Sequence, residues 1–350
     1  MTSCTLLAPA FGRSAPDPAA PLKIQVIRDR MTVDMTGFPQ VYLQGQIDAN
    51  APQRFRAMMD SGHIPAGSDV YLNVPGGDLR AAMALGRLFR AAGMATHLGT
   101  ARPPKHASVA AKTATCVDAC IYAYLGGLYR WAPSGMDRIG FSTAPATGAN
   151  ALPGMSAYLK QMDIEPAALG AVATPGQAGR IWMTADQMSA DGVANNGKLP
   201  LAVASQLVSA APTIELRQVG RRGTHRVTIE CRPGQTTVTA FDEVGTLRAR
   251  QVAARSARSY FQLGDKLLLS QPGDGVAAVG DAFAIRRSYP PADLVDLVSA
   301  WSFGAWVDGR SHAFRDGFSM PLHAVHRQLS DYFYACWRAA PWPPRPKTPR

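Results

Sequence analysis

The sequence lacks any uninterrupted apolar stretch long enough to cross a bilayer, which takes about 18 residues or more, so we predict no transmembrane segment. It has no run of five consecutive Lys or Arg residues, and its densest cationic positions carry no interleaved aromatics of the kind that stack on bases. We therefore interpret the net charge of +11 as scattered arginines and expect no nucleic-acid partner. The alternative that this charge permits is a nucleic acid or an anionic membrane as partner.

Cysteine is scarce, and no pair of CxxC motifs is present, so we predict no metal site and no cofactor. The five cysteines leave one over after any pairing; they are Cys4, Cys116, Cys120, Cys231 and Cys336. An oxidising export compartment would favour a disulfide between Cys231 and Cys336, although the spacing alone does not establish it.

The N-terminal segment has neither the basic region nor the long apolar core of a secretory signal. Residues 1–21 are rich in Pro, Ala and Ser and are predicted as a flexible arm or the remnant of a signal. If the true start lies upstream, Thr2-Ser3-Cys4 would end a lipoprotein-type cleavage site; otherwise Cys4 has no such role.

The first half of the chain alternates strand patterns with helix patterns. Residues 41–47, 69–74 and 94–98 are typical of strands, and residues 53–61 and 79–93 are typical of helices. Alternation at this spacing predicts an α/β layer with right-handed crossovers.

The second half changes pattern. Alternating β-type segments at 214–219, 226–231, 236–241 and 266–269 are separated by Pro/Gly turns, and helices are predicted over 290–301 and 322–337. The predicted fold is therefore an α/β domain followed by a mostly antiparallel β domain with C-terminal helices. The predicted parts are an arm (1–21), the α/β domain (22–197), a linker (198–212), the β-rich domain (213–340) and a Pro/Arg-rich tail (341–350).

Several motifs occur in a fixed order in the α/β domain. They are the strand Val41–Ile47, the segment Leu72-Asn-Val-Pro-Gly-Gly-Asp78 before a helix, Cys116-Val-Asp-Ala-Cys120 before a helix that ends at Gly126-Gly127, and Trp182–Met188 followed by Asp191-Gly192-Val193. Residues 22–197 with these motifs resemble the Clp protease proteolytic subunit, and more closely its exported bacterial relatives, within the crotonase-like superfamily. The resemblance implies repeated ββα-type layers, a serine peptidase site, assembly into rings and a location in the periplasm or cell envelope, with the cytoplasm as the alternative.

The resemblance also assigns site residues. The backbone N–H groups of Gly76 and Gly77, together with that of Ala119, would form an oxyanion hole. The family's catalytic serine corresponds to Asp118 and its histidine to Ser142. The orienting acid would fall near Gly179-Arg180-Ile181, where no carboxylate stands, so no catalytic triad is intact.

These substitutes do not suit acyl transfer. A serine hydroxyl holds its proton far above neutral pH, so Ser142 is no base. His97 and His106 lie in the same domain, but neither is where the family places its histidine. Asp118 either caps the following helix, which we favour, or acts as a crotonase-like acid/base carboxylate.

Three functions remain open. The first and favoured one is an inactive Clp-protease-like protein that acts as a binding or assembly module, whose partners would be further copies of itself in a ring and an unknown peptide or protein. The second is an active hydrolase or peptidase of this superfamily with rearranged catalytic residues. The third is an interaction protein that works through its C-terminal domain.

Overall fold

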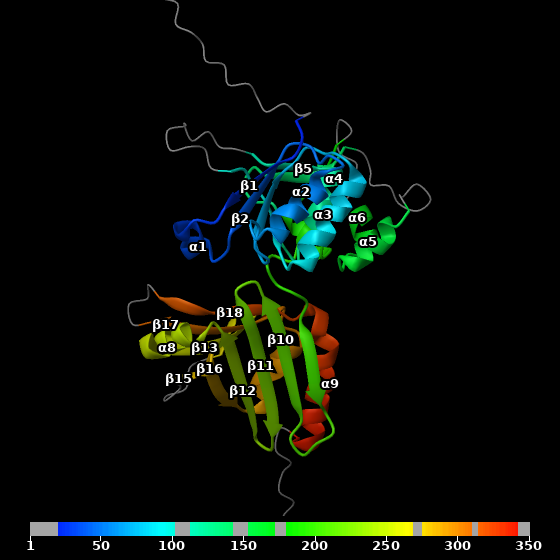
Figure 1. Cartoon of the computed structure of the whole chain (residues 1–350). Helices are drawn as coiled ribbons and strands as arrows, with labels where there is room; N and C mark the ends of the chain where they lie inside the picture. The colour runs from blue at the N-terminus through cyan, green and yellow to red at the C-terminus, as the bar shows by residue number, and fades with distance from the viewer. Residues whose placement is uncertain are drawn as a thin grey trace, which may run out of the picture. The chain divides into compact units, whose positions relative to one another are not determined.

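The computed structural model describes residues 20–101, 113–142, 153–171, 180–268, 275–309 and 314–341 (Figure 1). The chain forms two compact units that divide between Gly197 and Lys198. Unit 1 is Met1–Gly197 and unit 2 is Lys198–Arg350. None of the helices in the described ranges is long and apolar enough to span a membrane.

Unit 1 is a mixed α/β structure. Its main sheet has the strand order β1 (Lys23–Ile27), β2 (Gln40–Gln44), β3 (Asp69–Asn73), β4 (Ala95–Leu98), β6 (Tyr129–Arg130). The β1–β2 pair is antiparallel and the other pairs are parallel. A second sheet has the order β5 (Thr115–Val117), β7 (Arg138–Phe141), β8 (Ile181–Met183). The helices are α1 (Arg30–Thr36), α2 (Ala51–Asp60), α3 (Leu79–Ala91), α4 (Ala119–Leu125), α5 (Met155–Gln161), α6 (Pro166–Ala171) and α7 (Ala185–Ala190).

Helix α3 follows from its sequence. The Asp78 carboxylate accepts the Ala81 N–H at 2.7 Å and caps the first turn. Its apolar residues recur at helical spacing, and Leu85 and Phe89 are fully buried in the core. A Cβ added at Gly126, after α4, would lie 2.1 Å from the Gly86 Cα, so α3 and the end of α4 meet backbone to backbone.

A buried arginine, Arg130, connects the end of unit 1 to this core through hydrogen bonds. The Arg130 guanidinium donates to Val193 O at 2.8 Å, Gly127 O at 3.1 Å and Gly192 O at 3.2 Å. These carbonyl groups belong to the turn after α4 and to the turn after α7. One side chain therefore satisfies three main-chain acceptors from segments far apart in the sequence.

Strand β1 and helix α1 were not predicted from the sequence. The apolar residues of α1 are Met31, Val33 and Met35, which recur at every second position and not at helical spacing, and none of them is buried. It is held locally, because the Asp29 carboxylate accepts the Thr32 N–H at 3.0 Å and Gly37 ends it in the left-handed conformation.

Unit 2 is built mostly of antiparallel strands. One sheet has the order β15 (Val276–Val279), β16 (Ala282–Tyr289), β12 (Gln235–Glu243), β11 (Gly223–Arg232), β10 (Thr213–Gly220), β9 (Ala202–Gln206). The other has the order β14 (Lys266–Leu268), β13 (Ser256–Leu263), β17 (Ser302–Gly309), β18 (Arg315–Pro321). The helices are α8 (Thr246–Arg255), the 3-10 helices η3 (Pro291–Val298) and η4 (His323–Val325), and α9 (His326–Ala339).

Segments of unit 2 differ in part from the sequence-based expectation. The segment 198–212, predicted as a linker, contains β9, which pairs antiparallel with β10. The helix expected over 290–301 is the shorter 3-10 helix η3, and the one expected over 322–337 is divided into η4 and α9. A disulfide joins Cys231 on β11 to Cys336 on α9, the pair that an oxidising compartment was expected to favour.

Candidate functional site

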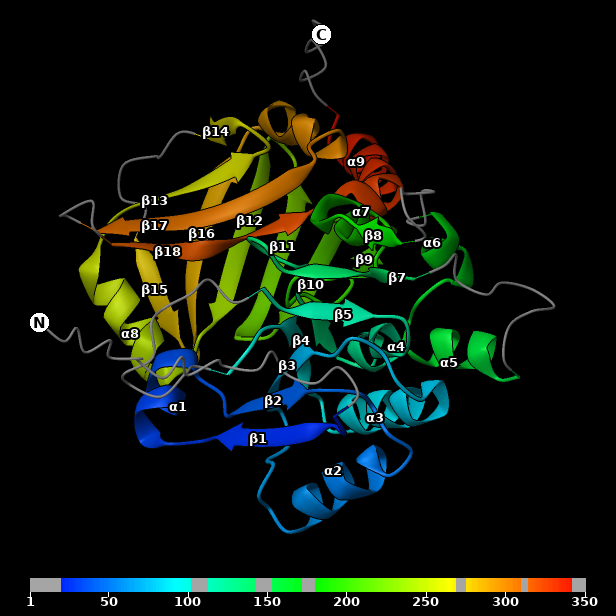
Figure 2. The same cartoon turned by 90° about the horizontal axis from the view of Figure 1, so that it is seen from above.

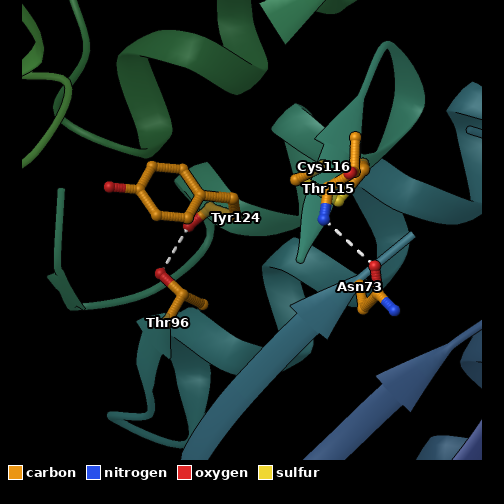
Figure 3. The surroundings of a disulfide bond; sticks show 6 residues. Asn73, Thr96, Thr115, Cys116 and Tyr124 are labelled. Atoms are coloured by element: carbon orange, nitrogen blue, oxygen red, sulfur yellow. Dashed lines mark hydrogen bonds between the residues drawn. A yellow bond between two sulfur atoms is a disulfide. The ribbon is translucent and has the colours of Figure 1, made fainter. Parts of the chain in front are cut away.

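The end of β3 lies directly beside β5. The Val74 N–H donates to Thr115 O at 2.7 Å, and the Val117 N–H donates to Val74 O at 3.1 Å. The Asn73 side chain accepts the Thr115 N–H at 3.0 Å, as Figure 3 shows. These parallel contacts bring the turn after β3 next to the turn after β5.

The turn after β3 is a double glycine with an unusual backbone. Gly76 and Gly77 have φ angles of 148° and 134°, which residues with a side chain rarely adopt. A Cβ at Gly77 would lie 2.3 Å from Ile47 O, whereas one at Gly76 would meet nothing within 4 Å. Neither glycine N–H donates a hydrogen bond to any described residue. Gly77 is exposed, whereas Gly76 is buried.

Asp118 forms a strained strand-to-helix turn between β5 and α4. Its φ and ψ angles are 53° and −114°, and its N–H donates to Gly140 O at 3.1 Å. A sharp turn of this kind is how nucleophile elbows present a side chain. The expectation that the Asp118 side chain caps α4 is wrong, because it makes no capping hydrogen bond.

The Asp118 carboxylate binds Ser142 instead. The Ser142 N–H donates to Oδ1 and the Ser142 Oγ–H donates to Oδ2, each at 2.7 Å. The parallel register of β5 and β7 (Figure 2), in which Val117 lies opposite Gly140, brings the two residues together although 24 positions separate them. The two positions that the resemblance assigns to the nucleophile and the base therefore contact each other.

A disulfide between Cys116 and Cys120 brackets Asp118. Both cysteines are fully buried, and their Cα atoms lie 5.3 Å apart. This pairing was not predicted from the sequence. The available signal was a pair of cysteines on either side of a strand-to-helix junction, where a sharp turn shortens the distance between them.

The orienting acid was expected near Gly179-Arg180-Ile181, at the start of β8. Strands β7 and β8 pair antiparallel as far as Phe141 and Ile181, and the next residues along the two strands are Ser142 and Arg180. Gly179 lies outside the described residues. Arg180 and Ile181 are described, and neither is a carboxylate.

Neither histidine of unit 1 considered as a substitute base lies beside Asp118 in the described part of the chain. The His97 ring stacks between Tyr71 and Trp131, with centroid distances of 4.8 Å and 4.4 Å, on β4 of the main sheet. His106 lies outside the described residues. No group of three or more His, Cys, Asp or Glu side chains in the described ranges is arranged to hold a metal ion.

Tyr122, on α4, is a further ionisable group near the site. Burial raises the pKa of its phenol, and the charge of Asp118 raises this pKa further. Its hydroxyl lies 3.4 Å from the Met155 sulfur. Tyr122 therefore stays protonated at neutral pH.

No protein-family model matches this chain, and no curated protein matches it. Among solved structures, it is similar to a ClpP1 point mutant from Listeria monocytogenes, with a TM-score of 0.29, 11% identity and coverage of 47% of this chain and 92% of that one. It is also similar to a point mutant of the 1510-N membrane-bound stomatin-specific protease, with a TM-score of 0.28, 17% identity and coverage of 44% and 76%. These are distant structural similarities to ClpP-like proteases, and they assign neither activity nor partner to this chain.

Proposed function

We propose that unit 1 is a Clp-type domain of the ClpP/crotonase fold that binds a peptide without hydrolysing it. The observation that carries the proposal is the Asp118–Ser142 pair, in which both carboxylate oxygens accept hydrogen bonds from Ser142 at 2.7 Å. Serine-type hydrolysis needs a hydroxyl nucleophile and a base that takes its proton. The carboxylate at position 118 offers no such hydroxyl, and the serine at position 142 offers no such base.

The remaining donors suit a carbonyl ligand. The Gly76 and Gly77 N–H groups have no acceptor among the described residues. Ala119 begins α4, and the first N–H groups of a helix have no acceptor within it. We propose that these groups hold a peptide carbonyl oxygen, which fits a binding role for a scaffold without a nucleophile.

Restoring the family residues tests this proposal. The wild-type protein is expected to remain unlabelled by a fluorophosphonate probe and to leave fluorogenic peptides intact. The double variant Asp118→Ser, Ser142→His is expected to gain labelling and peptidase activity, because it restores nucleophile and base on an existing turn. The single variant Asp118→Ser is the control and should show far less labelling, since it has no base.

The outcome that contradicts the proposal is labelling or peptide turnover by the wild-type protein that Asp118→Ala abolishes. Such a result would support the alternative of an active hydrolase with rearranged residues. A double variant that folds like the wild type, by circular dichroism, and yet never reacts would argue against the assignment of positions 118 and 142.

We also propose that the chain assembles with itself and resides in the cell envelope. Self-assembly rests on the family resemblance and is tested by light scattering after size exclusion, where a mass of a single chain would contradict it. The envelope location is supported by two disulfides, which form in oxidising compartments. Alkylation of the protein in intact cells should find these four cysteines oxidised; four free thiols would indicate the cytoplasm.

A further inference from the structure

Two exposed arginines flank a tryptophan next to Ser142. Strand β8 pairs with β7 so that Trp182 lies opposite Gly140. Alternate residues of a strand share a face, so Arg138 and Gly140 on β7 lie on the same face as Trp182. The Arg138 and Arg180 Cζ atoms lie 5.7 Å and 5.9 Å from the centre of the Trp182 ring.

The burial pattern shows that this face is accessible. Ile139 and Ile181, on the opposite face of the sheet, are buried, whereas Arg138 and Arg180 are exposed and Trp182 is half-buried. Within the described residues neither guanidinium forms an ion pair: the carboxylate of Asp137, next to Arg138, accepts the Ala114 N–H instead.

Arginine paired with a tryptophan face is a common way to hold a planar anion. The indole orients each guanidinium through the ring's negative face and leaves its N–H groups free. A guanidinium presents those N–H groups in a fork that matches the two oxygens of a carboxylate. Two cations on one ring also repel each other, and an anion between them would relieve that repulsion.

The Arg138–Trp182–Arg180 row lies next to the site described above. Arg180 and Ser142 are the residues that follow the last β7–β8 pair, and Ser142 donates to Asp118. We propose that this row is a carboxylate-binding subsite, which selects peptides that carry a free C-terminal or side-chain carboxylate. The inference rests on the proposed function, because a peptide held at the Gly76–Gly77 turn is the ligand whose carboxylate it recognises.

Calorimetric titration with four acetylated hexapeptides tests the subsite. The first is apolar with a free C-terminus, and the second is the same peptide amidated. The third carries two glutamates and an amidated end, and the fourth has glutamines in their place. We expect the free acid to bind more tightly than its amide, or the glutamate peptide more tightly than the glutamine peptide; which pair differs identifies the source of the carboxylate.

Variants then assign the binding to the two arginines. Arg138→Met and Arg180→Met should each weaken binding of the carboxylate peptide roughly fivefold, which is the size expected for a partly solvated ion pair. Neither variant should change the affinity for the peptides without a carboxylate. Arg56→Met is the matched control, because it removes the same charge from an exposed position on α2. It should leave all four affinities unchanged.

Three results would overturn the subsite. They are equal affinities within both peptide pairs, no binding of either carboxylate peptide at millimolar concentration, or the same loss in Arg56→Met as in the other two variants. The proposed non-hydrolysing function is tested by a separate measurement. If mass spectrometry finds the peptide cleaved, the non-hydrolysing role is wrong, while the dependence on the two arginines still decides the subsite.

Discussion

Asp118 is one of three described non-glycine residues with a positive φ angle, and its side chain is tied to Ser142 at both oxygens. Replacing it with alanine removes two charge-assisted hydrogen bonds and keeps a Cβ in a strained conformation. We predict that Asp118→Ala destabilises unit 1 by about 2 kcal/mol. Asp118→Asn should cost less than half of this, because asparagine has the same shape and keeps one acceptor oxygen. Urea unfolding of the two variants measures the difference, and an alanine variant as stable as the wild type would contradict it.

Buried tyrosines predict the behaviour of unit 1 in alkali. Burial raises the pKa of Tyr124, whose hydroxyl donates to Trp131 O at 3.0 Å, and burial also raises the pKa of Tyr158. Above about pH 10 a tyrosine in the unfolded chain loses its proton while the folded one keeps it, so stability falls as pH rises. Urea midpoints at pH 9, 10 and 11 should fall steeply.

The variant Tyr124→Phe isolates this effect. Above pH 10, the free energy of unfolding of this variant should decrease less steeply with pH than that of the wild type, by up to about 1.4 kcal/mol per pH unit. The comparison is needed because burial lowers the pKa of Arg130 to about 10, and this group acts in the opposite direction over the same range. Equal slopes for the two proteins would show that Tyr124 ionises as readily folded as unfolded.

At the scale of elements, the two disulfides should differ in their contribution to stability. Cys231–Cys336 spans a sequence separation of 105 residues, whereas Cys116–Cys120 spans a separation of 4. From loop-closure entropy, the disulfide that closes the long loop should add about 5 kcal/mol to the free energy of unfolding, and the one that closes the short loop roughly 2 kcal/mol. We predict that Cys231→Ala, Cys336→Ala destabilises its unit at least twice as much as Cys116→Ala, Cys120→Ala. Guanidinium unfolding of both pairs tests the order, and the reverse order would contradict the entropic account.

The elements that could be predicted from the sequence are those with regular apolar patterns. Strand β12 alternates strictly between buried and partly exposed residues, and it was expected within two residues of its ends. Strands β17 and β18 were not predicted, because they contain glycines, which are typical of turns. Gly317 is required within β18, since a Cβ there would lie 2.0 Å from Ala305 O on the neighbouring strand.

In the candidate site, the sequence identified individual residues but not the contacts between them. Asp118 and Ser142 could be singled out from the order of the motifs, but their contact depends on the register of β5 and β7, which no local pattern encodes. The Arg138–Trp182–Arg180 row was not predicted for the same reason, since an antiparallel pairing across some 40 positions creates it. The Asp118 cap was wrong because Ser142, distant in sequence, competes for the carboxylate.

At the scale of the whole molecule, each unit has its own hydrophobic core. The core of unit 1 includes Phe55 and Phe89, that of unit 2 includes Phe261 and Phe303, and the two cores share no residue. We predict that residues 198–350 fold when expressed alone in an oxidising compartment. Circular dichroism should show a β-rich spectrum and a single cooperative thermal transition, matching one of the two expected for the full chain. A fragment without cooperative unfolding would contradict this independence.

Both disulfides lie within single units, one in unit 1 and one in unit 2, and together they use four of the five cysteines. No cysteine pair in the described structure crosses from Gly197 to Lys198, so the main chain is the covalent connection there. Recombination of the gene at this point would exchange one unit without separating any disulfide-bonded cysteine from its partner. At this boundary one unit can therefore be replaced, by evolution or by protein engineering, while each unit still forms its own disulfide.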